Sequence, residues 1–134
     1  MDRDNPTPKL GKLEATNPCG EQPLLPYETC NLGSIVLSRM VKEDNGAVVI
    51  DWDKLKEVVY YATRFLDNTI DINNFPLARV EQMSKGTRRI GLGVMGWATM
   101  LGFLSIPYDS EEARSICSAL TAILTGHAYQ ISAK

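Results

Sequence analysis

Hydrophobic residues recur every three or four positions between residues 52 and 72. This spacing predicts one broad apolar face of an α-helix, made of Leu55, Val58, Val59, Ala62, Phe65, Leu66 and Ile70. Asp51 stands just before the pattern and is a suitable N-cap, and Asn73-Asn74-Phe75-Pro76 follows it with helix-ending residues. We therefore predict an amphipathic helix over 52–72.

Helical patterns continue toward the C-terminus. We predict short helices over 77–84 and 97–103, and a last helix that begins near Asp109 or Ser110. Asp109, with Glu112 three residues later, resembles a capping box. The apolar face of the last helix consists of Ile116, Leu120, Ile123, Leu124 and Ile131. The range 51–134 is therefore predicted to be mainly helical.

Two apolar runs before the long helix predict a β-hairpin over 34–50. Its strands would be Ser34-Ile35-Val36-Leu37 and Ala47-Val48-Val49-Ile50, and Asn45-Gly46 suits the tight turn because both residues tolerate positive φ. Prolines at positions 6, 8, 18, 23 and 26 instead predict extended loop over residues 1–29.

Composition limits the class of protein. The chain has 134 residues, enough for one domain with a core. Its net charge of −2 argues against a nucleic-acid partner held by phosphate attraction. The sequence lacks both the roughly 18 apolar residues that a membrane span needs and the apolar segment of a signal peptide. We expect a cytoplasmic protein with reduced thiols and no membrane partner.

The cysteines do not form a disulfide or zinc pattern. There are three, Cys19, Cys30 and Cys117, and the single histidine is His127. An odd number at wide spacing is not a disulfide framework, and no Cys-x-x-Cys occurs, so we predict no metal site. Cys117 lies beside the apolar positions of the last helix, which predicts a packed core thiol, and we interpret His127 as structural.

Cys19 lies in a proline-bounded loop between an amide and a carboxylate. In an extended segment alternate residues project to the same side, so Asn17, Cys19 and Glu21 are predicted to converge. A thiol, a base and a hydrogen-bonding amide form a plausible catalytic set. The alternative is that Cys19 is a small core residue, as isolated cytoplasmic cysteines usually are. Cys30 has two interpretations as well: a buried strand residue, or a redox thiol near Cys19.

A glycine string follows the predicted helix over 77–84. Gly91-Leu92-Gly93-Val94-Met95-Gly96 matches G-x-G-x-x-G, but a dinucleotide site also needs a buried strand before it and an acid that ends a second strand. The preceding residues 84–89 are polar, and Glu111 and Glu112 open a helix. We favour the alternative that these glycines allow close backbone packing between a short strand and the helix that begins at Trp97.

Two segments resemble a known family. Residues 17–28, Asn-Pro-Cys-Gly-Glu-Gln-Pro-Leu-Leu-Pro-Tyr-Glu, and residues 30–35, Cys-Asn-Leu-Gly-Ser-Ile, closely resemble the finger-loop segment of ribonucleotide reductase large subunits. The sequence Pro-Cys-Gly-Glu-Gln-Pro-Leu of residues 18–24 is most similar to the adenosylcobalamin-dependent class. Residues 89–98, Arg-Ile-Gly-Leu-Gly-Val-Met-Gly-Trp-Ala, resemble a second segment of the family.

The resemblance implies an α/β barrel with a cysteine at the tip of a loop in its centre. It implies that Cys19 becomes a thiyl radical that takes the 3′ hydrogen of the substrate ribose, while Glu21 acts as base toward the 3′ hydroxyl. Asn17 would hydrogen-bond the ribose region, and Cys30 would be half of the cysteine pair that supplies the reducing electrons. The implied cofactor is adenosylcobalamin, and the implied substrate is a ribonucleoside di- or triphosphate.

The family's proteins are several times longer than this chain. We therefore expect residues 1–134 to be a fragment of the catalytic barrel, with 1–33 as loop and finger loop, that needs complementary reductase segments or chains for activity. The alternative hypothesis is a non-catalytic truncated module that only associates with itself or with such chains, because the apolar helix faces need covering.

Overall fold

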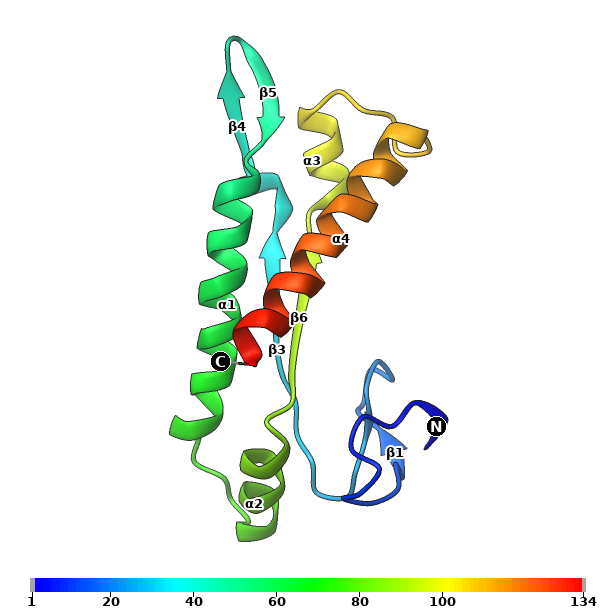
Figure 1. Cartoon of the computed structure of the whole chain (residues 1–134), viewed down its shortest axis with the longest axis vertical. Helices are drawn as coiled ribbons and strands as arrows, with labels where there is room; N and C mark the ends of the chain where they lie inside the picture. The colour runs from blue at the N-terminus through cyan, green and yellow to red at the C-terminus, as the bar shows by residue number, and fades with distance from the viewer. Residues whose placement is uncertain (1, 134) are drawn as a thin grey trace.

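A computed structural model describes residues 2–133 and shows a parallel strand pair flanked by helices (Figure 1). Met1 and Lys134, the ends of the predicted 1–134 range, lie outside the described residues. The helices are α1 (Trp52–Ile72), α2 (Ala78–Thr87), α3 (Trp97–Phe103) and α4 (Glu111–Ser132). The strands are β1 (Ala15–Thr16), β2 (Pro23–Leu24), β3 (Asn31–Val36), β4 (Val41–Asp44), β5 (Ala47–Ile50) and β6 (Ile90–Met95). The mixture of helix and strand confirms the predicted α/β class.

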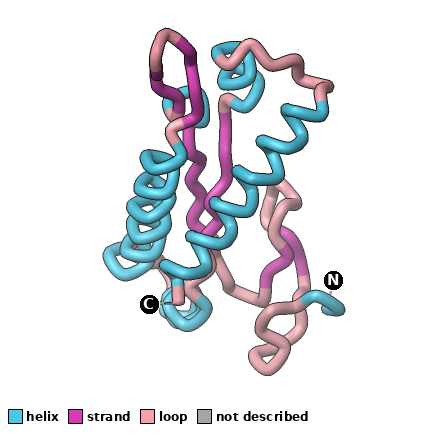
Figure 2. The backbone as a smooth tube through the Cα atoms, turned by 45° about the horizontal axis from the view of Figure 1, so that its top comes forward, coloured by secondary structure: helices cyan, strands magenta, loops and turns pink. Residues whose placement is uncertain are grey.

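The β3–β6 pair is the centre of the fold. The two strands run parallel, with Asn31 opposite Ile90 and Val36 opposite Met95. Parallel neighbours need a long crossover connection, and here it contains the β4–β5 hairpin, α1 and α2. Figures 1 and 2 show α4 crossing the strand pair obliquely toward α1, while the N-terminal segment with β1 lies apart from both helices.

The core lies where β3, α1, α3 and α4 meet. Ile35 of β3, Leu55 and Val59 of α1, Met100 of α3 and Leu120 of α4 are all buried in one cluster. These residues are far apart in sequence, so their removal from water ties the helices and the strand pair into one unit.

Helix α1 has the predicted bounds and N-cap. The Asp51 side chain accepts a hydrogen bond from the Lys54 backbone N–H at 3.1 Å. The predicted face is buried at Leu55, Val59, Leu66 and Ile70. Phe65, at the edge of this apolar face, is 71% exposed. It lines a groove beside β3, whose outer edge has no further strand among residues 2–133.

The hairpin is shorter than predicted. Strand β4 pairs with β5, with Asp44 opposite Ala47, so the loop is the two residues Asn45 and Gly46. Both have positive φ (51° and 81°), which confirms the predicted turn. The assignment of residues 34–37 as the first hairpin strand is wrong. A two-residue turn pairs only the strands that directly flank it, which frees residues 34–36 for the parallel pairing with β6.

The N-cap of α4 is Ser110, and the capping box predicted at Asp109 is wrong. The Ser110 hydroxyl accepts from the Ala113 backbone N–H at 3.1 Å and donates to the Pro107 carbonyl at 2.7 Å. Helix α2 is longer than predicted: it ends at Thr87, and its C-cap Arg88 adopts a left-handed conformation (φ 49°). Within residues 2–133 no helix is long and apolar enough to cross a membrane.

Candidate functional site

Residues 15–24 form a small hairpin, which we call the finger loop. Strands β1 and β2 pair antiparallel, and residues 17–22 make the turn between them. The Asn17 backbone N–H donates to the Gln22 carbonyl at 3.1 Å, and the Gly20 N–H donates to the Asn17 carbonyl at 3.0 Å. The segment is therefore a closed turn and not the extended strand from which we predicted that Asn17, Cys19 and Glu21 converge.

The finger loop presents Cys19 and Glu21 to solvent. Both side chains are exposed. Gly20 between them has φ +80°, a conformation that L side chains rarely adopt. Asn17 is half-buried, and its side-chain oxygen accepts from the Gln22 N–H at 3.0 Å. Asn17 thus closes the turn that carries Cys19, a structural task that the sequence analysis did not predict.

Cys30 lies directly before β3 and is half-buried. Its Sγ is 3.7 Å from the Asn31 carbonyl oxygen. Burial raises the pKa of the Cys30 thiol; the positive charge of Arg89 opposes this, and the carboxylates of Glu21 and Glu28 add to it. Cys30 therefore lies within electrostatic reach of the finger-loop carboxylate Glu21, at a lower exposure than Cys19.

A buried ion pair holds the base of the finger loop. The Glu28 side chain is fully buried, and Arg89 Nε donates to its Oε1. The second oxygen of Glu28 accepts from the Leu25 N–H at 2.8 Å, and Arg89 also donates to the Thr7 hydroxyl at 3.2 Å. The pair joins three segments: the N-terminal loop, the residues after β2, and the start of β6.

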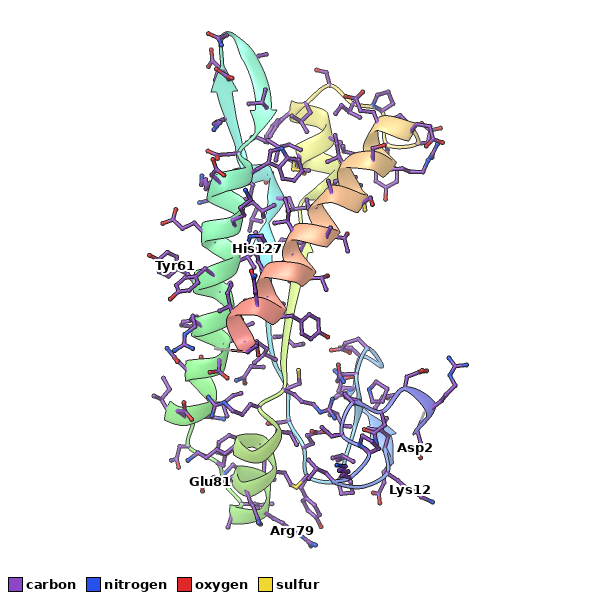
Figure 3. All side chains as sticks on the ribbon, in the orientation of Figure 1. Asp2, Lys12, Tyr61, Arg79, Glu81 and His127 are labelled. Carbon is purple, nitrogen blue, oxygen red and sulfur yellow. The ribbon has the colours of Figure 1, made fainter. Side chains whose placement is uncertain are left out.

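Two further contacts fasten the same region to α2. The Thr29 and Ser84 hydroxyls are 2.6 Å apart and share a hydrogen bond. The Arg79 guanidinium lies 4.6 Å from the centre of the Tyr27 ring, a cation–π contact. Figure 3 shows Arg79 on α2, at the end of the molecule next to the N-terminal segment. The residues between the finger loop and β3 are therefore held on two sides.

The glycine string lies within and just after β6. A Cβ at Gly91 would come 2.5 Å from Leu32 Cδ2 on the neighbouring strand. Gly96 has φ +75°, caps α3, and packs against Ser38. A side chain would not fit without strain at either position, as predicted, but the neighbours are Leu32 of β3 and Ser38, not the backbone of α3.

Comparison with known proteins agrees with the resemblance in the finger loop. A family model described as "Ribonucleotide reductase, barrel domain" matches residues 1–134. The chain belongs to this family. A vitamin B12-dependent ribonucleoside-diphosphate reductase of Mycobacterium tuberculosis is 52% identical over 120 residues, which cover 90% of this chain and 16% of that protein.

Other relatives of this barrel-domain chain include a second vitamin B12-dependent reductase and a reductase named as a subunit alpha. A vitamin B12-dependent ribonucleoside-diphosphate reductase of Thermoplasma acidophilum is 49% identical over 132 residues, 98% of this chain and 17% of that protein. A ribonucleoside-diphosphate reductase subunit alpha of Chlamydia pneumoniae is 37% identical over 123 residues, 89% of this chain and 11% of that protein. The barrel-domain chain thus spans about a sixth or less of the length of these relatives.

Three expectations concern residues outside the finger loop of this barrel-domain chain. Cys117 is exposed on α4, so its predicted place in the core is wrong. The His127 ring Nδ1 lies 3.1 Å from the Ile123 carbonyl oxygen. Among residues 2–133 no three side chains of His, Cys, Asp or Glu gather as a metal site would require.

The Glu28–Arg89 pair is the part of the site that sequence reasoning missed. Glu28 stands between Tyr27 and Thr29, and Arg89 follows another arginine, so neither neighbourhood predicts burial. Their separation of 61 positions carries no periodic signal. The one available hint was that each belongs to a segment that resembles the reductase family.

Proposed function

We propose that this chain is the part of a ribonucleotide reductase that carries the radical-forming cysteine, and that the complete enzyme reduces ribonucleotides to deoxyribonucleotides. The observation that carries this proposal is Cys19 at the exposed tip of a hairpin loop, with its turn closed by Asn17 and its base held by Glu28 and Arg89. The long finger-loop resemblance and the named relatives support it. The complete enzyme is an oxidoreductase of deoxyribonucleotide biosynthesis, which supplies DNA replication, and we place it in the cytoplasm.

Each site residue has one role in the proposal. The Cys19 thiyl radical takes the 3′ hydrogen of the ribose and returns it at the end of the cycle. Glu21 removes the proton of the 3′ hydroxyl, which helps the 2′ hydroxyl to leave as water. Asn17, whose side-chain oxygen is engaged within the turn, offers its amide N–H groups to the ribose. Cys30 and a cysteine outside this chain become a disulfide and so supply the two electrons.

The residues present fit adenosylcobalamin as the cofactor of the complete enzyme. An exposed sulfur–hydrogen bond at a loop tip is open to hydrogen-atom transfer toward a group held by other segments. When bound, the cofactor supplies the one-electron chemistry that removes this hydrogen atom. This chain's contribution is to hold the thiol at that position. The names of the Mycobacterium and Thermoplasma relatives support the cobalamin class.

The test is reconstitution. The chain is mixed with complementary reductase segments, adenosylcobalamin, a dithiol and a ribonucleoside di- or triphosphate, and deoxyribonucleotide is measured. We expect product from the mixture, none from the chain alone, and none after Cys19→Ser. Cys117→Ser is the matched control, because Cys117 is also exposed but lies on α4 away from the finger loop. Product formation that survives Cys19→Ser contradicts the radical assignment.

A second candidate function is favoured by one observation. Strands β3 and β6 have only each other as partners among residues 2–133, so both outer edges are unpaired. Such edges are templates for pairing with another chain. The chain would then be a non-catalytic module that associates with itself or with complementary segments, without binding nucleotide or cobalamin.

A further inference from the structure

The Glu28–Arg89 pair lies at the start of the central strand pair. In the parallel register Asn31 is opposite Ile90, so Glu28 and Arg89 stand just before the first paired residues. Cys30 follows Glu28 by two residues, and its Sγ lies 3.7 Å from the position that a Cβ of Gly91 would take. The ion pair therefore closes the same end of β3 and β6 at which the Cys30 thiol is packed.

A buried ion pair is an energetically costly way to hold two segments together. Burying a carboxylate and a guanidinium removes both from water, and well-packed apolar residues stabilise a contact at least as well. Here every partner is specified: Glu28 accepts from Leu25 and Arg89, and Arg89 also donates to Thr7. A contact of this kind fixes direction and charge, which an apolar contact does not.

We propose that Glu28 and Arg89 form a positioning pair for Cys30: their buried ion pair fixes the end of β3 and β6 at which the thiol packs and balances the charges that the thiol faces. The proposal rests on the proposed function, in which Cys30 is a redox thiol, and adds the residues that adjust it. The charged groups that act on Cys30 are Arg89, Glu21 and Glu28. Arg89 lowers the pKa of the thiol, whereas both carboxylates raise it.

The two halves of the pair predict opposite effects. Arg89→Gln removes the cation and leaves the Glu28 carboxylate, so the pKa of Cys30 rises further and its alkylation at about pH 8 slows severalfold. Glu28→Gln removes a carboxylate and leaves Arg89, so the pKa falls and alkylation speeds up severalfold. The double variant should lie close to the parent. The measurement is iodoacetamide labelling of Cys30 across pH, quantified by mass spectrometry.

A purely structural role predicts a different pattern. Loosening the loop would expose Cys30 in both single variants, so both would label faster. That result, or no change in either variant, overturns the proposal. Arg89→Lys keeps the charge but not the bond geometry, and should keep the pH profile near that of the parent. If Glu28→Gln does not fold, Arg89→Gln decides, because loss of the cation predicts slower labelling of Cys30 whereas a loosened loop predicts faster labelling.

The labelling experiment and its control variant do not depend on catalysis. Arg114→Gln removes an exposed arginine of α4 that pairs with Glu111, so it should leave Cys30 labelling unchanged. All labelling is done on the chain itself, without cofactor or substrate. Failure of the reconstitution test would therefore contradict the proposed function alone, whereas same-direction shifts in Cys30 labelling would contradict only the positioning pair.

Discussion

The three cysteines occupy three different environments. Cys19 is exposed on a turn, Cys117 is exposed on a helix, and Cys30 is half-buried at the start of a strand. Cys117 follows the half-buried Ile116, and one residue of a helix is a rotation of about 100°. That rotation carries Cys117 out of the contact surface of α4. Proximity in sequence to apolar residues therefore predicted burial wrongly for Cys117.

Thiol labelling of the reduced chain should reflect these environments. We expect Cys19 and Cys117 to react faster than Cys30 at about pH 8, because Cys30 is shielded and its raised pKa leaves less thiolate. The rate for Cys30 should keep rising until the pH passes its pKa, which lies above the ordinary thiol value, and then level off. Alkylation with mass-spectrometric mapping measures all three at once. If Cys30 labels first, its burial is wrong.

Among the elements, the start of α4 is decided by a few hydrogen bonds. Asp109 and Ser110 are adjacent, and both are typical N-cap residues. The structure selects Ser110, whose hydroxyl bonds both the Ala113 N–H and the Pro107 carbonyl. The turn after Pro107 orients Ser110 toward the helix, since the Ser110 N–H also bonds the Pro107 carbonyl at 3.3 Å.

Removing the cap of α4 should weaken the fold measurably. Ser110→Ala leaves the Ala113 N–H without its side-chain partner, and we expect the free energy of unfolding to fall by about 1 kcal/mol. Asp109→Ala is the matched control and should cost distinctly less. Urea unfolding followed by circular dichroism compares the two. A loss for Asp109→Ala equal to or larger than that for Ser110→Ala would contradict Ser110 as the N-cap.

At the scale of the whole molecule, the fold leaves an apolar groove beside an unpaired strand edge among residues 2–133. A groove of about 340 Å³ runs between the outer edge of β3 and α1. Its lining is mostly apolar and includes Leu32, Val36, Ala62, Phe65 and Leu66. An unpaired strand beside such a groove suits a further strand from another chain or segment.

We expect the isolated chain to self-associate through this groove at micromolar concentrations. Phe65→Lys places a charge in the groove and should shift the chain toward monomer in sedimentation velocity. Tyr61→Lys is the matched control, because Tyr61 is 62% exposed on α1, outside the groove lining, and points away from α4 (Figure 3). A parent chain that stays monomeric at all concentrations contradicts this prediction, and complementary reductase segments should compete with self-association.

The sequence by itself determined the features that depend on a few neighbouring residues. The 3.6-residue period and Asp51 predicted α1, Asn45-Gly46 predicted the hairpin turn, and the residues around Cys19 indicated a proline-bounded loop and the reductase family. These signals are local, because a helix face, a cap and a positive φ each arise within one or two turns of chain.

Only the tertiary structure decided what distant segments do to one another. It paired residues 31–36 with 90–95, whereas the sequence predicted a pairing of residues 34–37 with 47–50. It also buried Glu28 against Arg89 and exposed Phe65 and Cys117. The physical reason is that strand partners and burial depend on which surfaces meet once the crossover connection has folded. A short run of apolar or charged residues does not by itself specify which distant segment it will contact.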